Sequence, residues 1–229
     1  MINYILNILK QFWERKTKMN NAKYIYEELE KLFPDARCEL NYNNSFELLV
    51  DVVLSAQTTD KAVNRINVEL FKKYPDAFKM SEADEKDIAE IIKSIGLYKN
   101  KAHNLKKLSQ QLVENYSGNV PEKFDDLITL AGVGRKTANV VMAELYNYPA
   151  FAVDTHVERV SKRLNIADKN DSVIIVEKKL CSFFPKDLWH RLHHLLIFFG
   201  RYKCHSKNPQ CNGCPFKYIC SYTKEKTAE

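Results

Sequence analysis

The segment Leu130-Ala131-Gly132-Val133-Gly134-Arg135-Lys136-Thr137 decides the fold, because it sets a tight turn with two glycines between two stretches of helical pattern. Those stretches cover residues 122–130 and 136–146. Glycines let a backbone approach a ligand closely, and the N-terminus of the following helix adds partial positive charge. The spacing is neither that of a dinucleotide loop nor that of a Walker loop. The turn is therefore either ordinary helix-turn chemistry or a cradle for a phosphate group.

The rest of the chain continues the helical pattern. Apolar side chains recur at three-to-four spacing in the segments 24–33, 46–54, 62–71, 88–95, 102–116, 156–164, 173–184 and 188–202. Asn44 and Glu47 have the spacing of a capping pair for the second of these helices. Only the short segment 150–153 is equivocal between strand and loop. The predicted fold class is all-α, with packed helical layers.

The composition is that of a folded protein with a mild positive charge. Of 229 residues, 45% are hydrophobic and 28% are charged, and six Gly with seven Pro are few, which excludes a linker or a disordered chain. Lys and Arg number 35 against 29 Asp and Glu, a formal charge of +6. This excess favours a polyanionic partner but does not identify one.

The N-terminal residues 1–18, MINYILNILKQFWERKTK, have an amphipathic pattern. Apolar residues fall at helical spacing: Ile2, Ile5, Leu6, Leu9 and Trp13. The segment is too short and too interrupted to span a bilayer, and it lacks the features of a signal peptide. We expect an extra helix or a frayed extension, with a membrane-surface helix as the alternative. The expected location is cytoplasmic, with no membrane span.

Four of the six cysteines crowd into one run near the C-terminus, Cys204-x6-Cys211-x2-Cys214-x5-Cys220. In a reducing compartment, closely spaced thiols are metal ligands more often than disulfides. Four thiolates suit zinc or an iron–sulfur cluster, and the single Cys-x2-Cys pair with gaps of six and five favours a cubane cluster. The other two, Cys38 and Cys181, are predicted to be small buried residues.

The segment Val153-Asp154-Thr155-His156 places a carboxylate directly before a helix. Asp is a favoured N-cap, and capping alone explains such a residue. A capping carboxylate is also held rigidly at the positive end of a helix and can still face a cleft. A lysine beside a glycine hairpin, Lys136, together with a fixed Asp, supplies the parts of amine nucleophilic catalysis through a Schiff base.

These three motifs, in this order, resemble the endonuclease III family of DNA glycosylases in the helix-hairpin-helix superfamily. The resemblance runs from about Asn20 to Cys220 and includes Leu-Ser-Ala-Gln-Thr-Thr-Asp at 54–60 and Ile-Gly-Leu-Tyr at 95–98. It implies two all-α domains with a DNA cleft between them. Residues 38–148 would form a six-helix barrel with the hairpin at 130–137. Residues 19–37 plus 149–229 would form an iron–sulfur domain, and 1–18 an extension.

The resemblance also implies roles for individual residues. Lys136 would be the nucleophile and Asp154 its partner. Gln57 would fill the space left by an extruded nucleotide, and Leu97 would wedge into the opposite strand. The remaining implied DNA contacts are Gly132, Val133, Gly134, Arg135 and His156. The implied ligands of a [4Fe-4S] cluster are Cys204, Cys211, Cys214 and Cys220.

The implied activity is that of a bifunctional enzyme of base excision repair. It would remove oxidised pyrimidines from double-stranded DNA and nick abasic sites by β-elimination through a lysine Schiff base, acting as a monomer. One departure from the family pattern is Ala131, where the family commonly has Pro. The alternatives are a monofunctional glycosylase of the same superfamily, which Lys136 disfavours, and a non-catalytic iron–sulfur protein that docks on DNA.

Overall fold

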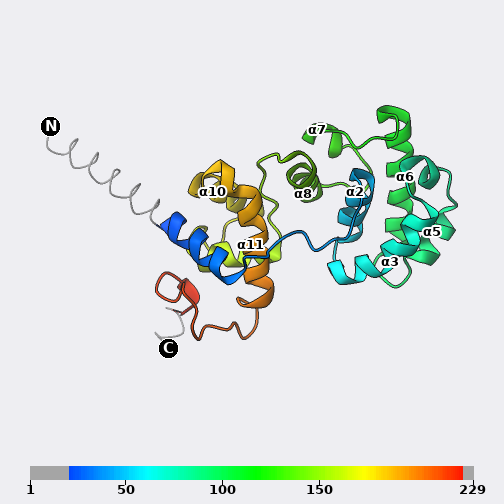
Figure 1. Ribbon diagram of the computed structural model, residues 1–229. Helices are drawn as coiled ribbons and strands as arrows, with labels where there is room; N and C mark the ends of the chain where they lie inside the picture. The colour runs from blue at the N-terminus through cyan, green and yellow to red at the C-terminus, as the bar shows by residue number, and fades with distance from the viewer. Residues whose placement is uncertain (1–20, 224–229) are drawn as a thin grey trace, which may run out of the picture. The chain divides into compact units, whose positions relative to one another are not determined.

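The structure is a computed structural model that describes residues 21–223, and regular structure in this part of the chain is helical throughout (Figure 1). Residues 21–32 form the first described helix. The elements that follow are α2 (Ser45–Leu54), α3 (Asp60–Lys73), α4 (Ala77–Ser81), α5 (Glu85–Ile91), α6 (Tyr98–Tyr116), α7 (Phe124–Leu127), α8 (Arg135–Tyr146), α9 (Thr155–Arg163), α10 (Val173–Phe183), the 3₁₀ turn η1 (Lys186–Leu188) and α11 (Trp189–Tyr202). The all-α prediction is confirmed. The predicted extension 1–18 lies outside the described residues.

The structure corrects one local prediction, resolves one equivocal segment and adds one helix that was not predicted. The helix expected over 122–130 is only the four-residue α7. The equivocal segment 150–153 is not a strand: it is irregular and buried, and Asn139 Nδ2 of α8 donates to the Phe151 carbonyl at 3.0 Å. Periodicity also missed α4, whose five residues are too few to show a period and whose first turn is capped by the Asp76 side chain.

The chain divides into two compact units. The first, Cys38–Ala152, holds α2 to α8 and has its own core, to which every one of these helices contributes. Helix α2 is buried over nearly its whole length, and the Asn44 side chain accepts from the Glu47 amide at 2.9 Å, as predicted for its N-terminus. Helix α6 packs against α4 and α5, and α2 packs against α8. We call this part the hairpin unit.

The second unit comprises the described residues on either side, 21–37 and 153–223, and we call it the cysteine-loop unit. Helix α9 packs against α10 and α11. Arg191 of α11 fixes helix 21–32 by donating Nε and Nη2 to the two carboxylate oxygens of Glu30, both at 2.7 Å. This paired geometry holds both side chains more firmly than a single contact would. Tyr24 joins the same helix to the cysteine loop by donating to the Pro215 carbonyl at 2.7 Å.

Within residues 21–223 the structure has no helix that is both long enough and apolar enough to cross a membrane.

Candidate DNA-binding and metal site

The hairpin between α7 and α8 is fixed by two hydrogen bonds to a glutamine side chain of α6. Gln111 of α6 accepts from the Ala131 amide at 2.7 Å and donates to the Thr129 carbonyl at 3.1 Å. Gly132 has φ +78°, a conformation that other residues rarely adopt, and a Cβ added there would lie 3.1 Å from Asn104. Glycine is therefore favoured at this position by the backbone angle, and a larger residue would also crowd the Asn104 side chain of α6.

The second hairpin glycine opens onto free space. Gly134 is the N-cap of α8, no side chain caps this helix, and a Cβ added at Gly134 would meet nothing within 4 Å. The exposed end of the helix therefore offers backbone amides and partial positive charge to an anion. The Val133 side chain is buried, and its amide donates to the Leu130 carbonyl at 3.1 Å, so this residue anchors the turn. Its predicted DNA contact stays a prediction.

Lys136 stands exposed in the first turn of α8, two residues after Gly134. Arg135, beside it, lies over the ring of Phe124, with 5.5 Å between the guanidinium carbon and the ring centroid. This contact fixes the direction of the Arg135 side chain at the start of the helix. A lysine and an arginine at a helix N-terminus place charge against the dipole, an arrangement that a bound phosphate would relieve.

Gln57 and Leu97 share an unusual backbone conformation. Among the described non-glycine residues with positive φ, the others are asparagine or serine, while Gln57 has φ 55° and Leu97 has φ 59°. The left-handed region costs a residue with a Cβ roughly 1–2 kcal/mol. Both side chains are exposed, and Leu97 keeps 56% of its surface in solvent although it is a large apolar residue. Strain combined with exposure is typical of residues that act on a partner.

Asp154 is the N-cap of α9, as its position directly before a helical pattern predicted. Its Oδ1 accepts from the amides of His156 at 2.9 Å and Val157 at 2.8 Å. His156 is half-buried, and its Cβ would lie 2.8 Å from a Cβ added at Gly200 of α11. Burial is the main cause that lowers the pKa of His156. Packing therefore accounts for His156, and its predicted DNA contact stays a prediction.

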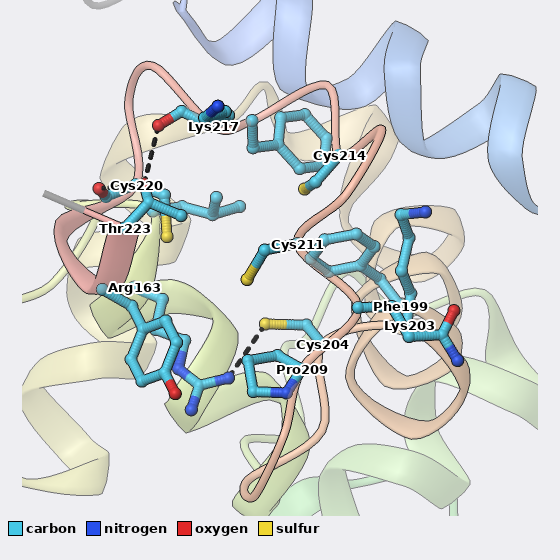
Figure 2. A pocket seen from close by; sticks show the side chains of 14 residues that line it. Arg163, Phe199, Lys203, Cys204, Pro209, Cys211, Cys214, Lys217, Cys220 and Thr223 are labelled. Atoms are coloured by element: carbon cyan, nitrogen blue, oxygen red, sulfur yellow. Dashed lines mark hydrogen bonds between the residues drawn. The ribbon is translucent and has the colours of Figure 1, made fainter. Parts of the chain in front are cut away.

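The four clustered cysteines line one cavity. Figure 2 shows their sulfur atoms pointing into a common space. The cavity is backed by Phe199 and Phe216, both fully buried. None of the six cysteines, all within residues 21–223, forms a disulfide, and Cys38 and Cys181, which were predicted to be buried, are half-buried. The side chains around the cavity include three cations and no carboxylate. The cations are Arg163, Lys203 and Lys217.

Two arginines of α9 hold the start of this loop, and sequence reasoning missed both. Arg159 donates to the Cys204 carbonyl at 3.1 Å and to the Gly200 carbonyl at 2.8 Å. Arg163 donates to the Cys204 sulfur at 3.2 Å and to the His205 carbonyl at 2.7 Å (Figure 2). Burial raises the pKa of the Cys204 thiol, and Arg163 acts in the opposite direction. An arginine beside a thiol favours the thiolate form that binds metals.

The comparisons with known proteins agree with this architecture. Residues 50–186 match the family model of the HhH-GPD superfamily base excision DNA repair proteins. The fold and the hairpin thus define a base excision repair protein of this superfamily.

Individual relatives narrow the class. Endonuclease III of Bacillus subtilis (strain 168) is 48% identical over 202 residues, which cover 88% of this chain and 92% of the relative. Endonuclease III of Escherichia coli (strain K12) is 41% identical, covering 91% of this chain and 99% of the relative. The structure of a trapped endonuclease III–DNA covalent intermediate superimposes with a TM-score of 0.86 at 49% identity, covering 90% of this chain and 96% of that one. The chain therefore belongs to the endonuclease III family. It is a DNA-binding enzyme of base excision repair, a DNA glycosylase and AP lyase.

Proposed function

We propose that this enzyme removes oxidised pyrimidines from double-stranded DNA and nicks the strand through a Schiff base on Lys136. The observation that carries the proposal is the exposed amine of Lys136 in the first turn of α8, next to the hairpin glycines. The open space at Gly134 supports a phosphate of the DNA backbone beside that amine. We further propose that the enzyme acts as a monomer in the cytoplasm.

The proposed reaction runs in two stages. The neutral amine of Lys136 attacks C1′, and the glycosidic bond breaks with its electron pair leaving on the base, which takes up a proton. The sugar ring then opens to give an imine at C1′. Loss of a proton from C2′ expels the 3′ phosphate, which breaks the strand 3′ to the lesion. Because C1′ is shielded in a stacked duplex, the nucleotide must first be extruded, and we assign Gln57 and Leu97 to that step.

We propose that Asp154 is a catalytic carboxylate as well as a cap. Its Oδ1 serves the two amides of α9, and the second carboxylate oxygen provides negative charge for proton transfer and for the positive charge that develops on the sugar. Asp154→Asn retains an oxygen that can cap the helix but removes the charge. Base release should fall by roughly 10²–10⁴-fold. Asp84→Asn, at the matched N-cap of α5, should leave the rate unchanged.

We propose that Cys204, Cys211, Cys214 and Cys220 hold a [4Fe-4S] cluster in the cysteine-loop unit. The donor set fits, because four thiols converge on one space (Figure 2). The cations around the cavity would balance the net negative charge of four thiolates on such a cluster. When bound, the cluster cross-links the loop. The division of the chain at 37/38 and 152/153 supports the proposed barrel and iron–sulfur domains, although the second boundary falls four residues after the predicted 148/149.

The proposed substrate class is tested with matched duplexes that carry one thymine glycol, one 8-oxoguanine or one abasic site. Strand breaks are measured with and without hot alkali, which separates base release from nicking. We expect base release and nicking on thymine glycol, nicking of the abasic duplex, and neither with 8-oxoguanine. Activity on 8-oxoguanine but not on thymine glycol would contradict the proposed lesion class. Base release without nicking would favour the monofunctional alternative.

A further inference from the structure

Lys101 of α6 retains only 4% of its surface in solvent, which is unusual because lysine side chains are rarely buried. Its ammonium donates to the Leu54 carbonyl at 2.9 Å and to the Thr58 hydroxyl at 2.8 Å. Both acceptors are neutral, and burial lowers the pKa of the Lys101 amine. A buried cation held only by neutral groups is costly, so its place in the structure calls for an explanation beyond packing.

The two acceptors lie on either side of the strained turn that carries Gln57. Leu54 is the last residue of α2, a helix with no basic residue in its own last turn. The ammonium therefore supplies the positive charge that a helix C-terminus favours. The Thr58 amide closes the turn by donating to the Ser55 carbonyl at 3.0 Å. The Lys101 side chain thus fixes both the start and the end of the turn that holds Gln57 in its left-handed conformation.

The backbone of the same residue fixes the other strained position. The Lys101 amide donates to the Leu97 carbonyl at 3.0 Å, in the first turn of α6. Leu97 itself precedes this helix with φ 59°, and no side chain caps the helix there. Lys101 therefore bonds to both ends of the Gln57 turn through its side chain and to Leu97 through its backbone, although Lys101 and Leu54 are separated by 47 positions in the sequence.

We propose that Lys101 is a positioning residue that holds the Gln57 turn and the Leu97 turn in register, so that both side chains enter the duplex together when a nucleotide is extruded. This inference rests on the proposed function, in which Gln57 and Leu97 contact DNA. Lys101 touches neither the sugar nor the base. Its effect is confined to extrusion, because the chemistry at C1′ belongs to Lys136.

The test compares a paired lesion with a lesion that is already unstacked. Lys101→Met keeps a long unbranched side chain, one heavy atom shorter than lysine, and removes the ammonium. Single-turnover base release is measured on a duplex with thymine glycol opposite adenine, and on the same duplex with thymine glycol in a one-nucleotide bulge. Loss of the ammonium should slow release from the paired lesion by about tenfold or more. Release from the bulge should change by less than about threefold, because there the extrusion step is already largely complete.

Matched variants separate positioning from stability. Lys107→Met removes an exposed lysine from the same helix and should behave as wild type on both duplexes. Thr58→Val removes one of the two acceptors while it keeps the shape of the side chain, and it should reproduce a smaller version of the Lys101→Met pattern. This second variant carries the test if Lys101→Met does not fold. Adding Lys101→Met to Gln57→Gly should slow paired-lesion release by less than about twofold more, because the two changes affect the same turn.

Equal losses on the paired and bulged duplexes would overturn the proposal and reduce Lys101 to a structural residue. Wild-type rates for both Lys101→Met and Thr58→Val would overturn it as well. Neither result would affect the proposed function, which is measured separately by nicking with the wild-type enzyme. If the wild-type enzyme acts on neither duplex, the proposed lesion class fails first.

Discussion

The hairpin unit exposes its candidate functional side chains to solvent, whereas the cysteine-loop unit turns its candidate functional side chains toward an internal cavity. In the hairpin unit, Gln57, Leu97 and Lys136 are exposed, and two of the three sit on strained backbone. In the cysteine-loop unit, four thiols face a common cavity, and Arg163 is committed to the loop around it. The first arrangement suits a partner that binds and leaves, and the second suits a group that stays. Residues of the first kind should matter for the reaction, and residues of the second kind for stability.

The largest effect is expected at Lys136. Lys136→Gln should reduce nicking of an abasic duplex by at least about 10³-fold, because an amide cannot form the imine. The thermal midpoint should stay at the wild-type value, since the side chain is exposed. Lys86→Gln, at another exposed lysine of the hairpin unit, serves as the charge control. A lower thermal midpoint for Lys136→Gln than for Lys86→Gln would contradict the claim that Lys136 serves the reaction and not stability.

The opposite pattern is expected at Cys211. Cys211→Ser replaces a soft thiolate by a hard, weakly acidic hydroxyl, so iron and the visible absorbance of the cluster should be lost. The thermal midpoint should fall by several degrees, because metal binding contributes folding free energy. Cys181→Ser, outside the loop, should keep both iron and absorbance. A Cys211→Ser protein with its cluster intact would remove this residue from the ligand set.

A buried carboxyl in the hairpin unit predicts a pH dependence of stability. Burial, with smaller contributions from Glu47 and Asp60, raises the pKa of Asp51 from 3.8 to about 7, and a hydrogen bond from Asn67 opposes the shift. The folded state therefore holds a proton that the unfolded chain releases. The contribution of Asp51 to the free energy of unfolding should be greatest below about pH 4. It should fall by about 4 kcal/mol as the pH rises to about 7.

Asp51→Asn tests this sign. The amide stays neutral at every pH and can still accept from Asn67, so the variant should be more stable than wild type at pH 8. Chemical denaturation at several pH values gives the difference between the two proteins, in which the other carboxylates cancel. A difference that does not change between pH 4 and pH 8 would show that Asp51 is ionised in the folded protein across that range.

The smallest effect is expected at Leu97. Leu97→Gly removes an exposed side chain and relieves a left-handed backbone, so the free energy of unfolding should stay the same or rise by up to about 1 kcal/mol. Base release from a paired lesion should nevertheless fall by about tenfold, because the wedge is gone. Loss of stability together with loss of activity would place Leu97 among the structural residues.

Much of this molecule could be predicted from local pattern. The periodicity of apolar residues located most of the helices, and the spacing of Asn44 and Glu47 predicted the cap of α2. The cysteine spacing predicted four thiols on one loop, and the structure has them around one cavity. These features depend on residues a few positions apart, for which sequence spacing translates directly into spatial position.

The missed residues are those whose partners are distant in sequence. The sequence gives no sign that Lys101 differs from a surface lysine. In the structure its ammonium donates to the Leu54 carbonyl at the end of α2. From its position in the pattern of α9, Arg163 would be expected to face solvent. It instead donates to Cys204 and His205, about 40 positions away in the sequence. Gln111 carries no signal for its contacts with the hairpin. Periodicity identifies which face of a helix is buried but not which polar group on that face meets a partner.

The central claim is that the amine of Lys136 forms an imine with the sugar of a damaged nucleotide. Its most direct test is borohydride reduction of the wild-type enzyme during incubation with a thymine glycol duplex, followed by peptide mapping of the protein–DNA adduct. We expect one adduct, on the peptide that contains Lys136, and no adduct for Lys136→Gln. An adduct on another lysine, or an undiminished adduct with Lys136→Gln, would contradict the account.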